Sequence, residues 1–122
     1  MIIVDASTVR LTATFTESTK DVDNTVDPAD NPPLTDLNHS TIYVKVGVAP
    51  PASVALIPAT AKTGGGNIST TILVPALANA KTTFTAWVTE TDDAGNEGPQ
   101  SNVVTMTIDR VGPMAPINFT LA

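Results

Sequence analysis

The chain has 122 residues, no Cys and a formal net charge of -6 at pH 7. This length suits one domain around one hydrophobic core, and the lack of Cys excludes disulfides and thiolate metal sites. Twelve Asp and Glu against six Lys and Arg leave no basic surface to neutralise phosphates, so we expect no nucleic-acid partner.

No apolar run approaches the roughly 20 residues that a membrane-spanning helix needs. The first residues, Met-Ile-Ile-Val-Asp, have neither the basic region nor the long apolar region of a secretory signal. We therefore expect neither a membrane partner nor secretion.

The composition favours strands over helices. Thr, Val and Ile make up 41 of the 122 residues, and β-branched side chains pack well on a pleated sheet. The ten Pro and seven Gly are scattered along the chain, as expected for short strands joined by turns. No ten-residue stretch has a helical period, so we predict an all-β fold with almost no helix.

The first half of the chain predicts two strands around a long loop. Residues 7–17 alternate, with apolar side chains on one face, namely Val9, Leu11, Ala13 and Phe15. Residues 20–36 contain five Asp and three Pro and predict a loop. Residues 41–48 alternate again, with Tyr43 and Lys45 opposite an apolar face formed by Ile42, Val44, Val46 and Val48.

The second half predicts four more extended segments. Residues 52–62 and 69–78 are separated by Thr-Gly-Gly-Gly-Asn, whose glycines suit a tight reversal. Pro58 and Pro75 predict that these segments are edge strands or strand ends. Residues 82–92 and 102–109 are two longer strands that flank a turn-rich loop.

The segment from Thr83 to Glu97 reads Thr-Phe-Thr-Ala-Trp-Val-Thr-Glu-Thr-Asp-Asp-Ala-Gly-Asn-Glu. It resembles strand F and the FG loop of a fibronectin type III domain. Residues 33–37 with 42–44 resemble the approach to strand C of that family, and residues 101–104 resemble the start of strand G. The resemblance covers roughly residues 8–109 and implies an immunoglobulin-like (fibronectin type III-like) antiparallel β-sandwich of about seven strands, which we place in residues 1–110.

The same resemblance assigns the family's aromatic corner to Phe84. The family usually carries Tyr there, and Phe84 lacks the hydroxyl that would bond the corner to the upstream backbone. The family's strand B Trp is also replaced, by the segment from Ala13 to Phe15.

Residues 111–122 form a Pro-containing tail. The segment from Pro113 to Leu121 resembles the linker and strand A that would open a following domain. Ile117, Phe119 and Leu121 alternate with polar residues, so we expect the tail to pair with a sheet edge of its own sandwich or of a neighbouring subunit, or to contact a partner.

Candidate sites for catalysis or metal binding are few. The single His, His39, adjoins a predicted loop, and no Ser sits in a nucleophile-elbow context. We expect no enzyme activity and no cofactor. Nine of the twelve acidic residues lie in 21–36 or 90–97, which the resemblance places at one end of the sandwich. Their spacing matches no calcium loop, and acidic loops commonly serve solubility, so they are weak metal candidates: Asp21, Asp23, Asp92 and Asp93.

A stronger candidate is an aromatic surface. If Phe84, Ala86 and Val88 point inward, the period of two directs Thr85, Trp87 and Thr89 outward. Tyr43 points outward by the same reasoning, so the only Tyr and the only Trp would share one face. Large amphipathic side chains anchor interfaces; alternatively, a loop or the tail covers them.

A small, signal-free sandwich with an unpaired tail is typical of phage virion proteins. We therefore expect a non-enzymatic structural protein that decorates or cements a phage particle, forms a homo-oligomer, and binds a major capsid or tail protein in the virion. One alternative is a carbohydrate- or protein-binding module of a larger surface protein or secreted enzyme, with Trp87 and Tyr43 as a stacking platform. Another is a calcium-stabilised adhesion domain.

Overall fold

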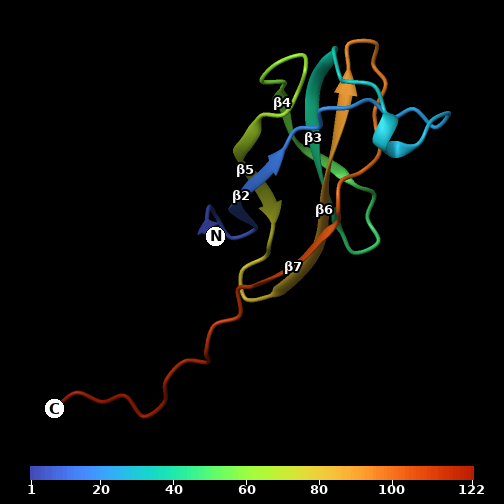
Figure 1. The fold of residues 1–122 in the computed structure, drawn as a ribbon. Coiled ribbons are helices and arrows are strands. Elements are labelled where there is room, and N and C mark those ends of the chain that lie inside the picture. Colours follow the sequence, from blue (N-terminus) through green and yellow to red (C-terminus); the bar gives the residue numbers. More distant parts are fainter.

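Seven strands form two antiparallel sheets in the computed structural model, which describes all residues from 1 to 122 (Figure 1). A three-stranded sheet has the order β1-β2-β5, and a four-stranded sheet has the order β4-β3-β6-β7. Their bounds are β1 Ile2–Ile3, β2 Thr8–Thr16, β3 Leu37–Val46, β4 Ala52–Pro58, β5 Asn67–Pro75, β6 Lys81–Asp92 and β7 Val104–Asp109. The all-β prediction is confirmed.

The helical content is a single short turn. Pro28–Asp30 form the 3-10 helix η1 inside the long β2–β3 loop. No helix of the structure has the length and apolar character needed to span a membrane.

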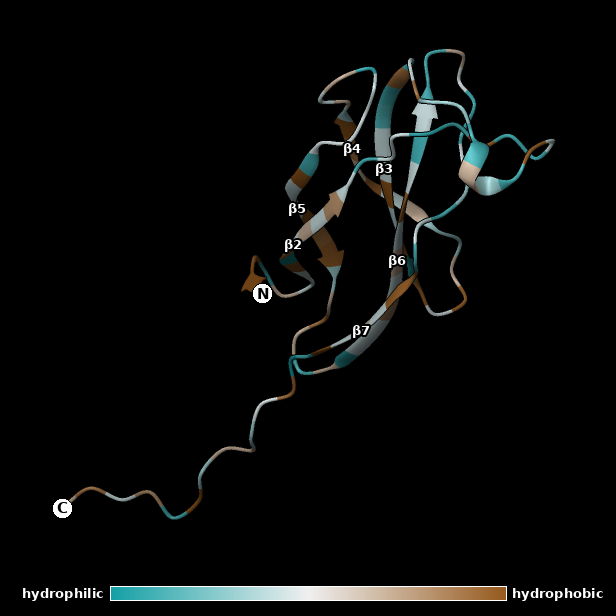
Figure 2. Ribbon diagram, viewed as in Figure 1, coloured by the Kyte–Doolittle hydropathy of each residue, from teal (hydrophilic) through white to brown (hydrophobic).

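The core lies between the two sheets and is built by the predicted alternation. Val9 on β2, Ile42 and Val44 on β3, and Phe84 on β6 are buried together. Leu11, Ala13, Phe15, Ala86 and Val88 pack against this cluster but remain partly exposed. Figure 2 shows apolar residues along the strands of both sheets and mainly hydrophilic residues in the loops above them.

The two long sides of the sandwich differ. On one side the edge strands β4 and β5 contact each other. On the other side lie β1 and β7. All nine residues of β2 pair with β5, from Thr8↔Pro75 to Thr16↔Asn67, but β1 pairs only with Val9 and Arg10. Residues 11–16 of β2 therefore have no neighbouring strand on this side, which we call the open side.

Several predicted boundaries were wrong. β3 begins at Leu37 and ends at Val46, and Val48 is fully exposed because Gly47 turns the chain out of the strand with a φ of 56°. The short strand β1 was not predicted. Pro58 and Pro75 do end their strands, as expected.

The glycine-rich segment does not close a hairpin, because β4 and β5 belong to different sheets. It carries the chain across the sandwich, and Gly64 and Gly65 have the predicted positive φ.

The tail forms no strand. It leaves the end of β7 and runs away from both sheets (Figure 1). Its apolar residues are exposed, with Ile117 at 83%, Phe119 at 80% and Leu121 at 85%. Of the two expected pairings, the one with its own sandwich is thus not formed.

Candidate functional site

The outer face of the four-stranded sheet carries an aromatic pair. Tyr43 on β3 and Trp87 on β6 are directly opposite in the ladder. Their ring centroids are 5.9 Å apart and the ring planes differ by 25°, so the rings are stacked. Both side chains are partly exposed. The structure therefore brings together the two aromatic residues that the sequence placed on one face, although Trp87 is less exposed than predicted.

A residue of the β6–β7 loop fixes this pair. The carboxylate of Glu97 accepts hydrogen bonds from the Tyr43 hydroxyl at 2.7 Å and from the Thr89 hydroxyl at 2.8 Å. Both hydrogen bonds hold the pKa of Glu97 below its usual value, and the same bond from Tyr43 raises the pKa of the phenol. The loop, not the tail, thus covers part of the aromatic face.

Two flanking threonines differ in exposure. Thr85 is partly exposed, as expected of a face residue. Thr89 points outward but is only 5% exposed, because Glu97 and the loop lie over it. Thr89 therefore points outward, as predicted, but little of its surface is exposed.

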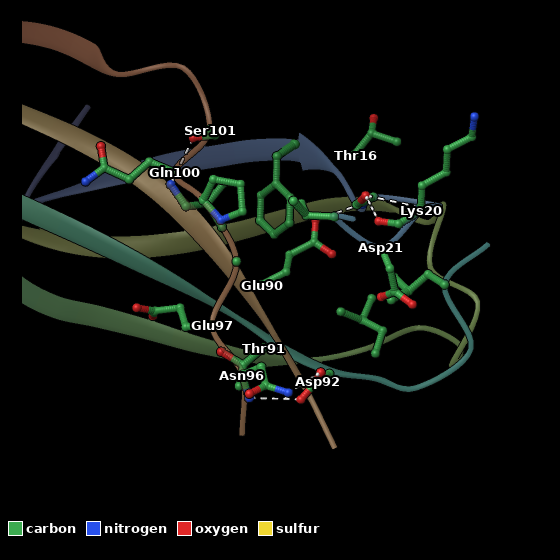
Figure 3. Close-up of a pocket in the computed structure, with 18 of the residues that line it drawn as sticks. Thr16, Lys20, Asp21, Glu90, Thr91, Asp92, Asn96, Glu97, Gln100 and Ser101 are labelled. Carbon is green, nitrogen blue, oxygen red and sulfur yellow. Dashed lines mark hydrogen bonds between the residues drawn. The ribbon is translucent and has the colours of Figure 1, made fainter. Parts of the chain in front are cut away.

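A hollow of about 850 Å³ lies on the open side, between the end of β2, the β2–β3 loop and the β6–β7 loop (Figure 3). Its apolar wall includes Phe15, Leu34 and Val88, and its polar wall includes Glu90 and Asp21. The hollow adjoins the stretch of β2 that has no outer neighbour.

Two carboxylates bind the loops at this end of the sandwich. Glu17, which is 3% exposed, accepts hydrogen bonds from the Thr60 amide at 3.1 Å, the Gly66 amide at 3.0 Å and the Thr60 hydroxyl. Glu90 accepts a bond from the Ser18 amide at 2.7 Å, while its other oxygen is buried without a partner. Burial raises the pKa of Glu90, and the charge of Glu17 raises it further.

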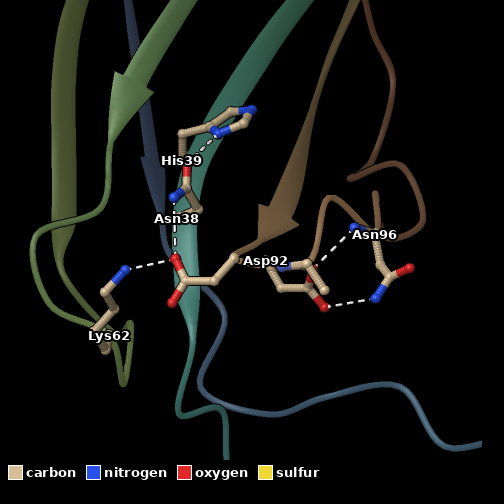
Figure 4. A network of polar contacts seen from close by, with 7 residues as sticks. Asn38, His39, Lys62, Asp92 and Asn96 are labelled. Atoms are coloured by element: carbon tan, nitrogen blue, oxygen red, sulfur yellow. Dashed lines mark hydrogen bonds and ion pairs between the residues drawn. The ribbon is translucent and has the colours of Figure 1, made fainter.

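The weak metal candidates have other partners. Asp92 accepts bonds from the Ala94 amide and from the amide and side chain of Asn96, which shapes the loop (Figure 4). Asp93 bonds Asn38 at 3.0 Å and forms an ion pair with Lys62 at 2.6 Å.

The carboxylate of Asp23 accepts hydrogen bonds from the amide and the hydroxyl of Thr25. Asp21 lines the hollow. The predicted gathering of acidic groups is real, since Asp92, Asp21 and Asp93 add to the burial that raises the pKa of Asp36. No group of three or more His, Cys, Asp or Glu side chains is placed to hold a metal ion.

His39 contacts its chain neighbour. Its ring nitrogen Nδ1 lies 2.7 Å from the side-chain oxygen of Asn38, and the residue is partly exposed on the same outer face as Tyr43.

The sequence did not predict the hydrogen bonds by which Glu17, Glu90 and Glu97 fix the loops. Glu17 directly follows the alternating stretch of β2, so its strand position gave a weak signal of burial. The partner of Glu97 depends on how the β6–β7 loop folds back, which no local pattern reveals.

No protein-family model, curated protein or solved structure matches this chain.

Proposed function

We propose that this chain is a non-enzymatic structural protein of a phage particle that decorates or cements larger virion subunits. The observation that carries the assembly role is the Tyr43–Trp87 stack on the outer face of the four-stranded sheet, where a hydrogen bond to Glu97 fixes Tyr43. A preformed aromatic anchor loses little rotamer entropy on binding, and Tyr and Trp are the side chains that dominate such interfaces. The phage particle is the proposed setting because a small β-sandwich with an unpaired tail is typical of phage virion proteins.

The proposal includes a fold of the fibronectin type III kind. The order β1-β2-β5 and β4-β3-β6-β7 supports it, since this order corresponds to strands A, B and E facing strands C′, C, F and G. The exposed tail would give a second contact besides the aromatic face. Repeated over a lattice of identical subunits, two modest contacts produce strong overall attachment.

Antibodies against the purified chain test the setting. They should label the surface of particles that carry the genome encoding the chain, in a regular pattern seen by electron microscopy. Purified particles that lack the chain would overturn the virion role.

Substitution of the aromatic anchor tests the contact face. Trp87→Ala should lower the occupancy of particles by about 30-fold, because truncation of an interface anchor costs about 2 kcal/mol. Leu73→Ala is the matched control, since Leu73 is 50% exposed on the other sheet. Equal occupancy of both folded variants would reject the aromatic face as the contact.

The alternative is a carbohydrate-binding module, and the partly exposed stack is the observation that favours it. A glycan array run on the wild type and on Trp87→Ala distinguishes the two functions. Specific glycan retention that is lost in the variant would replace the structural role by the binding role.

A further inference from the structure

β2 is hydrogen-bonded on one edge along its whole length but on the other edge only at its start. β5 pairs with all of Thr8–Thr16, whereas β1 pairs with Val9 and Arg10 alone. No third strand adjoins β2. Successive residues of an antiparallel strand direct their N–H and C=O groups to alternate edges. Half of the backbone groups from residue 11 to residue 16 therefore point to an edge where no strand lies, and such an edge is a template for an added strand.

The inner face of β2 is also incompletely covered there. Val9, next to β1, is 0% exposed, but Leu11, Ala13 and Phe15 remain partly exposed although they point the same way. Phe15 lines the hollow on the open side. In the same stretch of β2, the outer backbone groups therefore lack a partner strand and the inner side chains are incompletely covered.

The tail has the complementary features. Ile117, Phe119 and Leu121 are apolar and highly exposed, and Asn118 and Thr120 alternate with them. Residues 117–122 match residues 12–17 in number, and residues 12–17 comprise the last five residues of the uncovered stretch and the following Glu17. Both prolines of the tail come before residue 117, so no residue in this stretch lacks a backbone N–H.

We infer that residues 117–122 of a second copy of this chain add to the open edge of β2 as an antiparallel strand. The inference rests on the proposed assembly role and identifies the acceptor of the tail. The Ile2↔Arg10 pair, continued by one residue, places Met1 beside Leu11. The added strand then begins one residue farther along β2, with Ala122 beside Thr12.

In this register Leu121 lies opposite Ala13, and Phe119 lies opposite Phe15. Directly opposed residues of an antiparallel pair share a face, so Phe119 enters the hollow beside Phe15 and Leu121 covers the partly exposed Ala13. Thr120 lies opposite Thr14 on the solvent side.

The chain's own tail cannot make this pairing. Arg110 is bonded to the carbonyls of Ala76 and Ala80, and the Ala76 amide is bonded to the Ser7 carbonyl, so the tail departs from the level at which β2 begins. The far end of the acceptor, at Glu17, lies ten residues along β2 from Ser7, about 33 Å at roughly 3.3 Å per residue. From Arg110 to Ile117 the chain spans at most about 25 Å.

One residue of the tail must change conformation on docking. Asn118 has a φ of 59° and forms a bend, so it must become extended. Asn is among the residues that adopt both conformations readily, and the tail is exposed, so the change breaks no packing of the sandwich.

Disulfide trapping between two differently tagged copies tests the inference. The chain has no Cys, so Thr14→Cys in one copy and Thr120→Cys in the other are the only thiols. Opposed residues of an antiparallel pair lie about 4.5–5.5 Å apart between Cα atoms, within the range of a disulfide. The pair should cross-link at least about ten times faster than a control pair that joins Thr120→Cys to Val48→Cys, a fully exposed loop position. Phe119→Asp in the tail copy should reduce the rate to that of the control.

Equal rates for the two pairs would overturn the inference. So would an internal disulfide that forms in a chain carrying both Thr14→Cys and Thr120→Cys at a rate independent of protein concentration. The outcomes are separate from those of the proposed function. Particles labelled by antibody without specific cross-linking would remove the exchange alone, and specific cross-linking of chains that are absent from particles would remove the virion role alone.

Discussion

Glu97 connects a loop to the outer face of the four-stranded sheet, although it lies outside every strand. Its carboxylate accepts bonds from side chains of two neighbouring strands, Tyr43 on β3 and Thr89 on β6. The aromatic pair therefore depends on the charge state of one exposed acid. Protonation removes acceptor capacity and weakens both bonds.

We predict an acid-sensitive contribution of Glu97 to stability. Its pKa is below the ordinary value of 4.5 in the folded protein, so the stabilisation is fully present above that value and is lost as the pH falls through the lower, folded pKa. Glu97→Gln should lower the Tm by about 3–5 °C at pH 7. Thermal melts from pH 7 to pH 3 should show this difference shrinking, and a constant difference would contradict the role of the carboxylate charge.

For Glu90 we predict the opposite dependence of stability on pH. Burial raises its pKa in the folded protein, so the folded state binds the proton more tightly than the unfolded state. The contribution is then favourable at low pH and is lost as the pH rises from the ordinary value of 4.5 through the folded pKa. Thermal melts should find Glu90→Gln at least as stable as the wild type at pH 8, with its advantage disappearing toward pH 4.5. A variant that is less stable at pH 8 would show that the carboxylate is needed for its bond to Ser18.

At the scale of elements, the crossing from β4 to β5 depends on glycine. Gly64 has a φ of 66°, and a Cβ built there would lie 1.9 Å from the carbonyl oxygen of Ser18. Two other glycines allow the effect of the backbone strain to be measured apart from that of the clash. Gly47 has a φ of 56° with nothing within 4 Å, and Gly112 has neither a positive φ nor a neighbour.

We predict graded effects on the free energy of unfolding. Gly64→Ala should cost about 3 kcal/mol, because backbone strain and a clash with the β2–β3 loop add up. Gly47→Ala should cost about 1 kcal/mol from the backbone alone, and Gly112→Ala should have almost no effect. Urea unfolding measures all three, and equal losses for Gly64 and Gly47 would show that the loop shifts to avoid the clash.

Most strands were predictable because their inner faces alternate over a long stretch. Residues 7–17 and 82–92 follow the period of two closely, and the structure has β2 and β6 there. β1 was missed because two residues are too short for any period. The end of β3 was misplaced because Val48 continues the apolar alternation, whereas Gly47 sets the backbone direction.

The candidate site was predictable only in part. The alternation directed Tyr43 and Trp87 outward, and the fibronectin type III resemblance placed their strands side by side; their stacking follows from the ladder register. The roles of Glu17, Glu90 and Glu97 depend on contacts between residues 8 to 72 positions apart in the sequence. Such contacts are set by how the loops fold against the sheets, which local patterns do not encode.

At the scale of the whole molecule, the acidic loops and the tail lie at opposite ends. The acidic loops gather at one end of the sandwich, where the β2–β3 and β6–β7 loops meet. The apolar tail leaves from the other end, near Ala76 and Ala80. Repulsion between acidic ends disfavours their contact, which favours the association through the tail that we inferred above.

The last prediction concerns the assembled state. If the tail docks on a second copy, association stabilises the fold by mass action, and the Tm should rise by several degrees over a hundredfold increase in protein concentration.

Deletion of residues 111–122 should abolish this dependence and give a monomer by light scattering. The truncated sandwich should still melt cooperatively, because the deleted residues are exposed. Phe119→Asp should act like the deletion, because the added carboxylate would lose its water beside Phe15 and would be repelled by Asp21 and Glu90, which also line the hollow. A wild-type chain that is monomeric with a concentration-independent Tm would show instead that the tail is held free for a different protein.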